Sequence, residues 1–301
     1  MQLTEFADKS YALGLSCTHI HNDPTAAALF FHAWAAAHRR TTSPYPPFLH
    51  APALAVSPTS PPPPPPLLAE KASAVSPAST DATAMSSATF HFPASAVRAL
   101  LSTLEPGTTP FAALAALFWL RITGAADGEG ELTLALDFRK RMYAPLPLGY
   151  YGSSVHFTRA RADLASGLPA VAAALDRHVA GVPEDDLWRA LEWLHARQQQ
   201  EGDAAAPFQM YGPELTCAAL DHVLMYGAEF EAGVPPARVS CRVGGAAGEG
   251  LVLVLPAAEG GEARDVVVTL PAEATARICR DPEVLRHGAE VVFGAKAVKE
   301  E

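Results

Sequence analysis

Eleven prolines lie between Pro44 and Pro66, six of them in an unbroken run, and this stretch limits the possible fold more than any other feature. Proline fixes φ and lacks an amide hydrogen, so it interrupts helix interiors and central strands. The residues that follow are mostly Ser, Ala and Thr, which supply little apolar surface for a core. We therefore expect residues 41–88 to form an extended or disordered connector between residues 1–40 and residues 89–301.

The part after this connector shows alternating strand and helix patterns. Short apolar runs predict strands, and longer stretches with apolar residues at helical spacing predict helices. A turn at Gly260-Gly261 joins the last two of the expected strands, which lie at residues 89–92, 132–136, 251–255 and 266–270. Helices are expected at residues 93–104, from 110 onwards, 168–178, 184–200 and 272–280. This mixture places the chain in the α/β class.

The part before the connector predicts a hairpin followed by a helix. Residues 3–6 and 11–17 have the alternating pattern of strands. Residues 24–38 carry apolar side chains at helical spacing, and cations follow at the end where a helix is negative. Almost no sequence precedes these strands, so a small domain built from them lacks pairing partners unless other residues supply them.

Composition and charge exclude several function classes. The chain has 301 residues, 49% of them hydrophobic, which suffices for one large or two ordinary domains. A formal net charge of −10, without a basic run among aromatics, argues against nucleic-acid and anionic-membrane partners. Four scattered cysteines without CxxC spacing argue against a disulfide framework or a zinc site. No signal sequence or membrane span is visible, so we expect a cytoplasmic protein.

Residues 18–24 read Thr-His-Ile-His-Asn-Asp-Pro and join the second expected strand to the first expected helix. His19 and Asp23 form a His-x-x-x-Asp pattern, which can place a histidine base together with a carboxylate that fixes its geometry. Two other interpretations fit. Asp23 before Pro24 is also a suitable helix N-cap, with His19 as a hydrogen-bonded core histidine. His19 and His21 could bind a metal on one side of a strand, but no second histidine cluster with ligand spacing supports this, and no metal site is expected.

A second motif lies at residues 136–153, which read Leu-Asp-Phe-Arg-Lys-Arg-Met-Tyr-Ala-Pro-Leu-Pro-Leu-Gly-Tyr-Tyr-Gly-Ser. Together with Gly14-Leu15-Ser16 and the His-x-x-x-Asp pattern, it resembles the plant BAHD acyltransferases. Their corresponding run is Asp-x-Arg-x-Arg-x-x-Pro-x-Leu-Pro-x-x-Tyr-x-Gly-Asn, and Ser153 replaces its asparagine here. The resemblance extends from Gln2 to about Val292. It implies a chloramphenicol-acetyltransferase-like two-domain α/β fold with an incomplete first domain.

The resemblance also implies a reaction and the roles of individual residues. BAHD enzymes transfer an acyl group from coenzyme A to a hydroxyl or amine, so acyl-CoA is the expected co-substrate and no bound cofactor is expected. His19 would take the acceptor's proton, and an imidazole with its ordinary pKa of about 6.5 suits a base at neutral pH. Asp23 would pair with Arg139 and hold the His19 segment in shape, which is compatible with its N-cap interpretation. Tyr151 and Gly152 would support the site.

The family's Asp-Phe-Gly-Trp-Gly loop is degenerate in this chain. The aligned residues are Glu229, Phe230, Glu231, Ala232 and Gly233, so the tryptophan and one glycine are lost. We expect these substitutions to replace a tight, glycine-dependent turn with residues that prefer negative φ. The loop is structural in the family, so its loss does not by itself abolish the chemistry.

Three stretches, at residues 2–6, 211–216 and 250–256, resemble the Eceriferum/Glossy wax proteins, a branch of the same family. Those proteins keep the acyltransferase fold and promote elongation of very-long-chain fatty acids beside a condensing enzyme at the endoplasmic reticulum. Two hypotheses follow. The first is an acyl-CoA-dependent transferase in lipid or cuticular-wax metabolism. The second is a non-catalytic accessory protein of a fatty-acid condensing enzyme, peripheral to the endoplasmic reticulum.

The length of the chain departs from the family, whose members are roughly half as long again. The family sequence without a counterpart lies before Met1. We therefore expect residues 1–40 to be the C-terminal remnant of the first acyltransferase domain and residues 89–301 to be the second. The whole chain is expected to be a fragment, a shortened gene model or a decayed duplicate.

Overall fold

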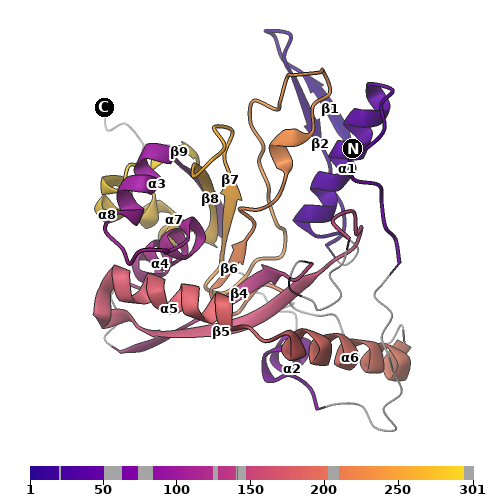
Figure 1. The fold of residues 1–301 in the computed structure, drawn as a ribbon. Coiled ribbons are helices and arrows are strands. Elements are labelled where there is room, and N and C mark those ends of the chain that lie inside the picture. Colours follow the sequence, from indigo (N-terminus) through magenta and orange to yellow (C-terminus); the bar gives the residue numbers. More distant parts are fainter. Residues whose placement is uncertain are drawn as a thin grey trace.

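A mixed β-sheet forms the centre of the computed structural model, which describes residues 1–19, 22–50, 63–73, 84–124, 128–139, 141, 147–202 and 210–294 (Figure 1). Its strands are β3 (Met85–Phe92), β4 (Glu129–Asp137), β5 (Val155–Asp163), β6 (Thr216–Ala219), β7 (Leu251–Pro256), β8 (Arg264–Pro271) and β9 (Glu290–Phe293). They lie in the order β5-β4-β6-β7-β8-β3-β9. The pairs β4–β6 and β6–β7 are parallel and the other neighbours are antiparallel. The predicted α/β class is confirmed.

Alternate residues of the central strands face two different cores. Leu132 and Leu134 of β4 belong to the larger core, whereas Ala135 belongs to the smaller core on the opposite face. In β7, Val252 and Val254 likewise face the larger core. Because both faces of the sheet are covered, these strands read as nearly continuous apolar runs.

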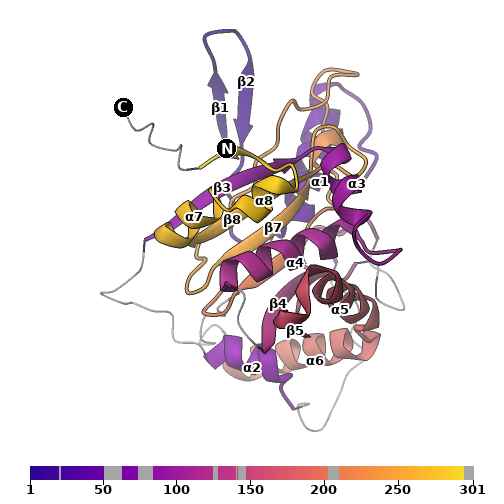
Figure 2. The ribbon, with the colours of Figure 1, turned by 90° about the vertical axis from the view of Figure 1, so that its left-hand side faces the viewer.

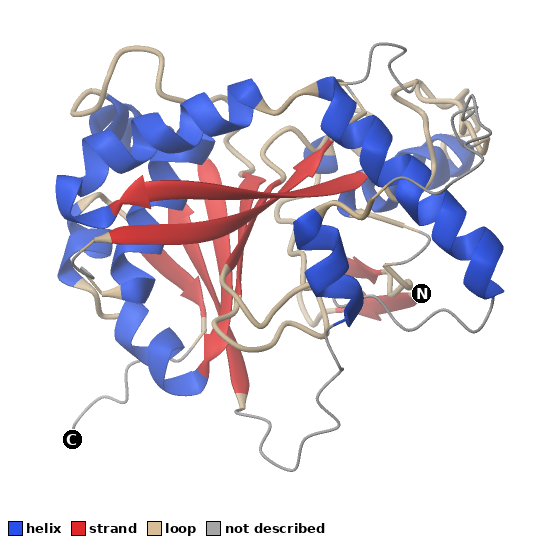
Figure 3. Cartoon of the chain, turned by 90° about the horizontal axis from the view of Figure 1, so that it is seen from below, coloured by secondary structure: helices blue, strands red, loops and turns tan. Residues whose placement is uncertain are grey.

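Helices cover both faces of the sheet (Figures 1 and 3). Five contribute to the larger core: α3 (Ala94–Leu101), α4 (Pro110–Thr123), α5 (Gly167–Gly181), α7 (Ala272–Ile278) and α8 (Pro282–Arg286). The smaller core takes side chains from α1 (Pro24–His38), α2 (Pro66–Ser73) and α6 (Glu184–Glu201). Short 3-10 helices also occur at Leu164–Ser166 and Met225–Gly227. Within the described residues, no helix has both the length and the apolar character needed to cross a membrane.

The N-terminal hairpin stands apart from the main sheet. Strands β1 (Gln2–Glu5) and β2 (Tyr11–Gly14) pair antiparallel and project away from the sheet (Figure 2). The predicted hairpin is confirmed, but its second strand ends at Gly14 and not at Cys17. The reason is the register, because Gly14 already pairs with Gln2, the first residue of β1. The chain after Gly14 is thus free to leave the hairpin and lead to α1, which has the predicted bounds.

Most predicted elements of the second part are present, with three strands and a helix added. Strands β5, β6 and β9 and helix α8 were not predicted. β5 is an edge strand that carries Arg159 and Arg161. It therefore lacks the uninterrupted apolar run from which the other strands were predicted. β6 and β9 each have only four residues. The helix expected at residues 93–104 ends at Leu101.

The proline-rich segment contains structure that was not expected. Helix α2 lies within residues 41–88, and Leu68 and Lys71 of this helix are buried. Phe48 forms a bridge with Tyr150, and β3 begins at Met85. The expectation of an extended or disordered connector is therefore wrong for these stretches, because a few contacts to the sheet order them. Residues 51–62 and 74–83 of the connector lie outside the described residues, and the division into two domains stays a prediction.

Candidate active site

The aspartate of the His-x-x-x-Asp segment begins helix α1. Asp23 is the N-cap, and its Oδ1 atom accepts a hydrogen bond of 2.8 Å from the amide of Ala26. Pro24 lies in the first turn, where its missing amide hydrogen leaves no intrahelical bond unmade. Local helix geometry therefore fixes Asp23 independently of its tertiary contacts.

A buried arginine binds the same carboxylate from the sheet. Arg139 follows β4 and contacts Asp23 with both arms of its guanidinium group, with Nη1–Oδ2 and Nη2–Oδ1 distances of 2.8 and 3.0 Å. The Arg139 and Asp23 side chains are 3% and 2% exposed, respectively. A two-point, charge-assisted pair of this kind fixes orientation as well as distance. The contact that the family resemblance implies is present.

Asp137 and Ser154 complete a group that we call the carboxylate cluster, defined as Asp23, Asp137, Arg139 and Ser154. Arg139 Nη1 also donates to Asp137 Oδ2 at 2.7 Å. Ser154 donates its amide to Asp23 at 2.8 Å and its hydroxyl to Asp137 at 2.9 Å. Two buried carboxylates therefore share one guanidinium group, and hydrogen bonds from Ser154 compensate part of the remaining negative charge.

Further partners keep Asp137 ionised. Burial alone would raise the pKa of Asp137, but a hydrogen bond with His222 and the charge of Arg139 outweigh it and hold the pKa well below its usual range. His222 Nε2 lies 3.2 Å from Asp137 Oδ2, and Thr25 of α1 donates its hydroxyl to the same oxygen at 2.8 Å. Asp137 and His222 meet because β4 and β6 are parallel, so their carboxyl ends lie at the same edge.

His19 lies outside the carboxylate cluster and has a separate partner. Its Nε2 atom is 2.9 Å from the hydroxyl of Tyr211, and the ring centroids are 5.7 Å apart. His19 Nδ1 is buried and has no hydrogen-bond partner among the described residues. Burial raises the pKa of Tyr211 far above its usual range, so this phenol keeps its proton at neutral pH. The two motif residues therefore contact different groups, a phenol for His19 and a guanidinium for Asp23.

A narrow cavity adjoins both sets of contacts. It lies between the start of α1 and the sheet, and Asp23, Thr25, Asp137 and Tyr211 contribute to its polar lining. Most of its apolar lining comes from β4, β6, β7 and their flanks, including Ala135, Leu136, Ala218, Leu220 and Leu253. Tyr211 thus links His19 to the space beside the carboxylate cluster.

The predicted supporting residues Tyr151 and Gly152 lie beside the cluster. The carbonyl of Gly152 accepts a hydrogen bond of 2.9 Å from Arg139. A Cβ atom at Gly152 would lie 2.7 Å from the hydroxyl of Tyr150, so a larger residue would need this ring to move. The backbone amide of Tyr151 donates a hydrogen bond of 2.9 Å to the carbonyl of Phe48, which joins this segment to the residues after α1.

The degenerate loop at residues 229–233 lies against α1 and outside the cluster. The ring of Phe230 packs edge-on against Trp34, with centroids 5.1 Å apart. The Glu229 carboxylate accepts the amide of Gly233 at 2.9 Å, and Gly233 has a φ of +76°. The retained Gly233 supplies the positive φ, whereas Glu231 and Ala232, which stand where the family pattern has other residues, do not have positive φ.

Asp137, Ser154, His222 and Tyr211 were not predicted as site residues. A signal existed for Asp137 and Ser154, which lie within or beside the motif at residues 136–153. The pairing of β4 with β6 would identify His222, but β6 was not predicted. Tyr211 is 192 positions from His19 and carries no local signal.

The interpretation of His19 and His21 as metal ligands finds no supporting ligand group in the described part of the chain. Among the described residues, no three His, Cys, Asp or Glu side chains are placed to hold a metal ion. His21, which that interpretation needs, lies outside the described residues.

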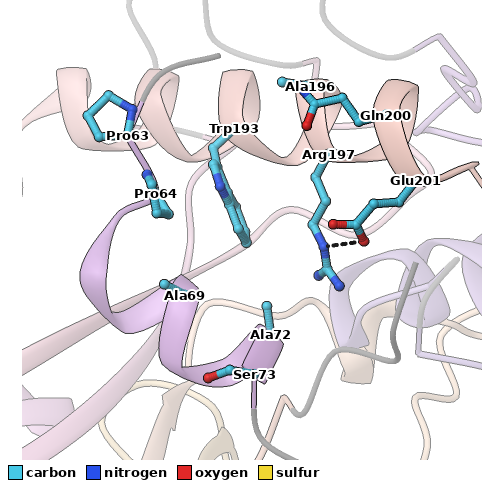
Figure 4. Close-up of a pocket in the computed structure, with 10 residues that line it drawn as sticks. All are labelled: Pro63, Pro64, Ala69, Ala72, Ser73, Trp193, Ala196, Arg197, Gln200 and Glu201. Atoms are coloured by element: carbon cyan, nitrogen blue, oxygen red, sulfur yellow. Dashed lines mark hydrogen bonds and ion pairs between the residues drawn. The ribbon is translucent and has the colours of Figure 1, made fainter. Parts of the chain in front are cut away.

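A larger pocket of about 460 Å³ lies between α2 and α6 (Figure 4). Trp193 projects from α6 toward α2 within it, and Arg197 lies beside it in an ion pair of 3.0 Å with Glu201. None of the residues that line it belongs to the carboxylate cluster, and neither His19 nor Tyr211 lines it. This pocket is therefore separate from the candidate active site.

Comparison with known sequences identifies related enzymes. A hydroxycinnamoyltransferase from Narcissus pseudonarcissus is 26% identical over 293 residues, which cover 91% of this chain and 66% of that protein. Tryptamine hydroxycinnamoyltransferase 2 from Oryza sativa subsp. japonica is 28% identical over 279 residues, which cover 87% of this chain and 64% of that protein. The chain thus spans just under two thirds of the length of these relatives.

Solved structures and a family model agree with these relatives. TRI101 of F. graminearum, complexed with coenzyme A and deoxynivalenol, superposes with a TM-score of 0.63 at 17% identity, covering 91% of this chain and 66% of that chain. Vinorine synthase gives 0.59 at 17% identity, covering 86% and 59%. At this identity the likeness shows the fold, which is the expected chloramphenicol-acetyltransferase-like one. Because a model of the Transferase family matches residues 1–285, the chain belongs to that family, the BAHD acyltransferases that its motifs resemble.

Proposed function

We propose that this protein transfers an acyl group from acyl-CoA to a hydroxyl or amine acceptor, with His19 as the general base. The observation that carries the proposal is the position of His19. Its Nε2 atom contacts a phenol that lines the narrow cavity, and Asp23, four residues later, is fixed by a buried ion pair. A base must lie within reach of the proton that it abstracts. His19 contacts the tyrosine that lines this cavity, and its segment is fixed at the Asp23 end by the ion pair with Arg139.

In the proposed reaction, His19 takes the acceptor's proton as the acceptor oxygen or nitrogen attacks the thioester carbonyl. A C–O or C–N bond forms and the C–S bond breaks. The imidazolium then returns its proton to the departing thiolate of coenzyme A, so the base is regenerated. Asp23 and Arg139 exchange no proton in this scheme, because their charges are fully engaged with each other and with Asp137. Their role is to hold the His19 segment in shape.

The test is an acyl-transfer assay on the 301-residue chain, read out by release of the coenzyme A thiol and by mass spectrometry of the product. We expect His19→Ala to lower turnover by about 10²–10⁴-fold, the usual contribution of a general base. His195→Ala is the control, because His195 is exposed on α6 and outside the cavity. Equal turnover of His19→Ala and the wild type would show that His19 is not the base. No turnover by the wild type with any donor and acceptor would overturn the proposal.

The acyl donor is proposed as either of two classes, each with its own support. The names of the two plant relatives favour a hydroxycinnamoyl donor, and the rice relative's name makes tryptamine an acceptor to try first. The stretches that resemble wax proteins favour a long-chain fatty acyl donor in lipid or cuticular-wax metabolism. Comparing kcat/KM for p-coumaroyl-CoA and for a long-chain fatty acyl-CoA with the same acceptor decides between them.

A second candidate function is a non-catalytic role beside a fatty-acid condensing enzyme at the endoplasmic reticulum. The degenerate loop at residues 229–233 favours it, because this change separates the chain from the family pattern. The protein would then lie in the cytoplasm at the membrane periphery. Co-expression with a condensing enzyme tests this role: longer fatty acids from both the wild type and His19→Ala, without acyl transfer in either, would support it.

A further inference from the structure

The imidazole of His19 has one hydrogen-bonded nitrogen and one buried, unpaired nitrogen. Among the described residues, the Tyr211 hydroxyl at 2.9 Å is the hydrogen-bond partner of Nε2, and Nδ1 has none. Because Nδ1 is buried, Nε2 is the nitrogen that an acceptor can reach. A base needs its lone pair on that nitrogen, so the productive tautomer carries its proton on Nδ1.

We propose that Tyr211 is a positioning residue that donates its hydroxyl to Nε2 and thereby holds His19 in the tautomer and orientation of a base. This inference rests on the function proposed above. Two observations support this role. Burial keeps the phenol protonated, so it has a hydrogen to donate. Tyr211 also lines the narrow cavity, so its side chain lies between His19 and the space beside the carboxylate cluster.

The Tyr211 ring is itself held by packing on the sheet. It packs in a T-shaped arrangement with the ring of Phe157 of β5, and the two ring centroids are 6.1 Å apart. The ammonium group of Lys71 lies over the same Phe157 ring, 4.8 Å from its centroid. A cation over an aromatic face is attracted by the ring's quadrupole. Phe157 therefore lies between Lys71 and the tyrosine that contacts His19.

Lys71 also binds residues on both sides of Tyr211 in the sequence. Its Nζ atom donates to the carbonyl of Met210 at 2.9 Å and to the carboxylate of Glu214 at 2.7 Å. The Lys71 side chain is only 2% exposed, and a buried ammonium group is stable only when it is paired and hydrogen-bonded. Since Lys71 belongs to α2, this connector helix holds in place the segment that positions His19.

The decisive experiment measures the tautomer of His19 directly, so it does not depend on turnover. The full chain is labelled with ¹⁵N in its histidine rings, and His19→Gln identifies the His19 signals. Tyr211→Phe removes one hydroxyl and keeps the ring. We expect it to shift both ring ¹⁵N resonances of His19. Tyr226→Phe is the matched control, because the Tyr226 hydroxyl accepts the amide of Val239 and not a histidine. Unchanged His19 resonances in Tyr211→Phe would overturn the proposal.

Steady-state kinetics provide a second test of the positioning role of Tyr211. Loss of one orienting hydrogen bond should lower kcat by about 3- to 10-fold and leave KM unchanged. A higher kcat in Tyr211→Phe would instead show that the phenol obstructs the base, which overturns the positioning role. If the wild type gives no turnover, the proposed function fails, and the ¹⁵N spectra still decide whether Tyr211 positions His19.

The anchoring by α2 is tested in the same spectra. Lys71→Met combined with Glu214→Gln removes the pair without leaving an uncompensated charge, and it should shift or broaden the His19 ring signals. Arg161→Gln is the control, since it breaks the 2.7 Å ion pair between a 70% exposed arginine of β5 and Glu131, and Glu131 is outside the Tyr211 segment. Unchanged His19 signals in the double variant would overturn the anchoring role.

Discussion

The two ends of the His-x-x-x-Asp segment are held in very different ways, although only three residues separate them. The Asp23 side chain is 2% exposed and accepts hydrogen bonds from the helix amide of Ala26, the guanidinium of Arg139 and the backbone of Ser154. The imidazole of His19 is half-buried and has one hydrogen-bonded nitrogen in the described part of the chain.

This difference indicates that Asp23 has a structural role and His19 a chemical role within one short motif. A buried carboxylate is tolerated only if every oxygen is paired, so the Asp23 end is necessarily rigid and costly to change. A base must exchange its hydrogen-bond partner during a reaction, so the His19 end cannot be equally saturated. We therefore expect substitutions at the Asp23 end to act mainly on stability and those at the His19 end mainly on turnover.

Arg139→Met is expected to have the largest effect on stability. The substitution leaves two buried carboxylates, Asp23 and Asp137, without their shared cation. Breaking a buried pair in this way costs about 3–5 kcal/mol in the free energy of unfolding. Urea unfolding at neutral pH measures it. Arg161→Met is the control, because Arg161 is 70% exposed and pairs with Glu131 on the sheet edge. A loss below about 1 kcal/mol, the range of a surface pair, would contradict the proposed role of the cluster.

The pH dependence of the free energy of unfolding is a second test of the carboxylate cluster. The pKa of Asp137 is lower in the folded chain than in the unfolded chain. Its contribution is therefore present above the unfolded pKa of about 4 and is lost as the pH falls toward the folded value. Stability of the wild type should consequently fall more steeply below pH 4 than that of Asp137→Asn. Parallel curves for the two proteins would show that Asp137 gains nothing from its partners.

Asp23→Asn is expected to have the second-largest effect. Asparagine still caps the helix, and Arg139 keeps Asp137 as a partner, so only one charge of the cluster is lost. We expect a loss of about 2–3 kcal/mol, less than for Arg139→Met, because here no carboxylate is left without a cation. The same urea titration measures it. A larger loss for Asp23→Asn than for Arg139→Met would contradict this ranking, because it would show that the Asp23 charge contributes more than the cation shared by the two carboxylates.

Ser154→Ala probes a single neutral contributor to the cluster. The variant loses the hydroxyl that donates to Asp137 at 2.9 Å and keeps the amide that donates to Asp23. A hydrogen bond to a charged group contributes about 1.5–3 kcal/mol, and we expect a loss near the lower end because Asp137 retains Arg139 and Thr25. Ser153→Ala, at the neighbouring half-buried position, should change stability less.

The same division explains what the sequence could predict. The bounds of α1 depend on local signals, an N-cap and proline at the start, and they were predicted correctly. The pairing of Asp23 with Arg139 spans 116 positions and was expected only from the family resemblance. Tyr211 and Lys71 had no such support. Lys71 lies in a helix whose local composition predicts disorder, and its burial depends on Glu214, 143 positions away.

His19→Ala should have the smallest effect on stability and thereby complete the comparison. The variant loses one hydrogen bond, to Tyr211, which is worth about 0.5–1.5 kcal/mol, and leaves the carboxylate cluster untouched. If the protein is an acyltransferase, the same variant should lose more turnover than any of the other single substitutions, because a missing base cannot be replaced by packing. Urea unfolding and the acyl-transfer assay on one preparation measure both effects. A loss of stability as large as that of Arg139→Met would show that His19 is part of the same rigid structure, and the division between a structural and a chemical end of the motif would then be wrong.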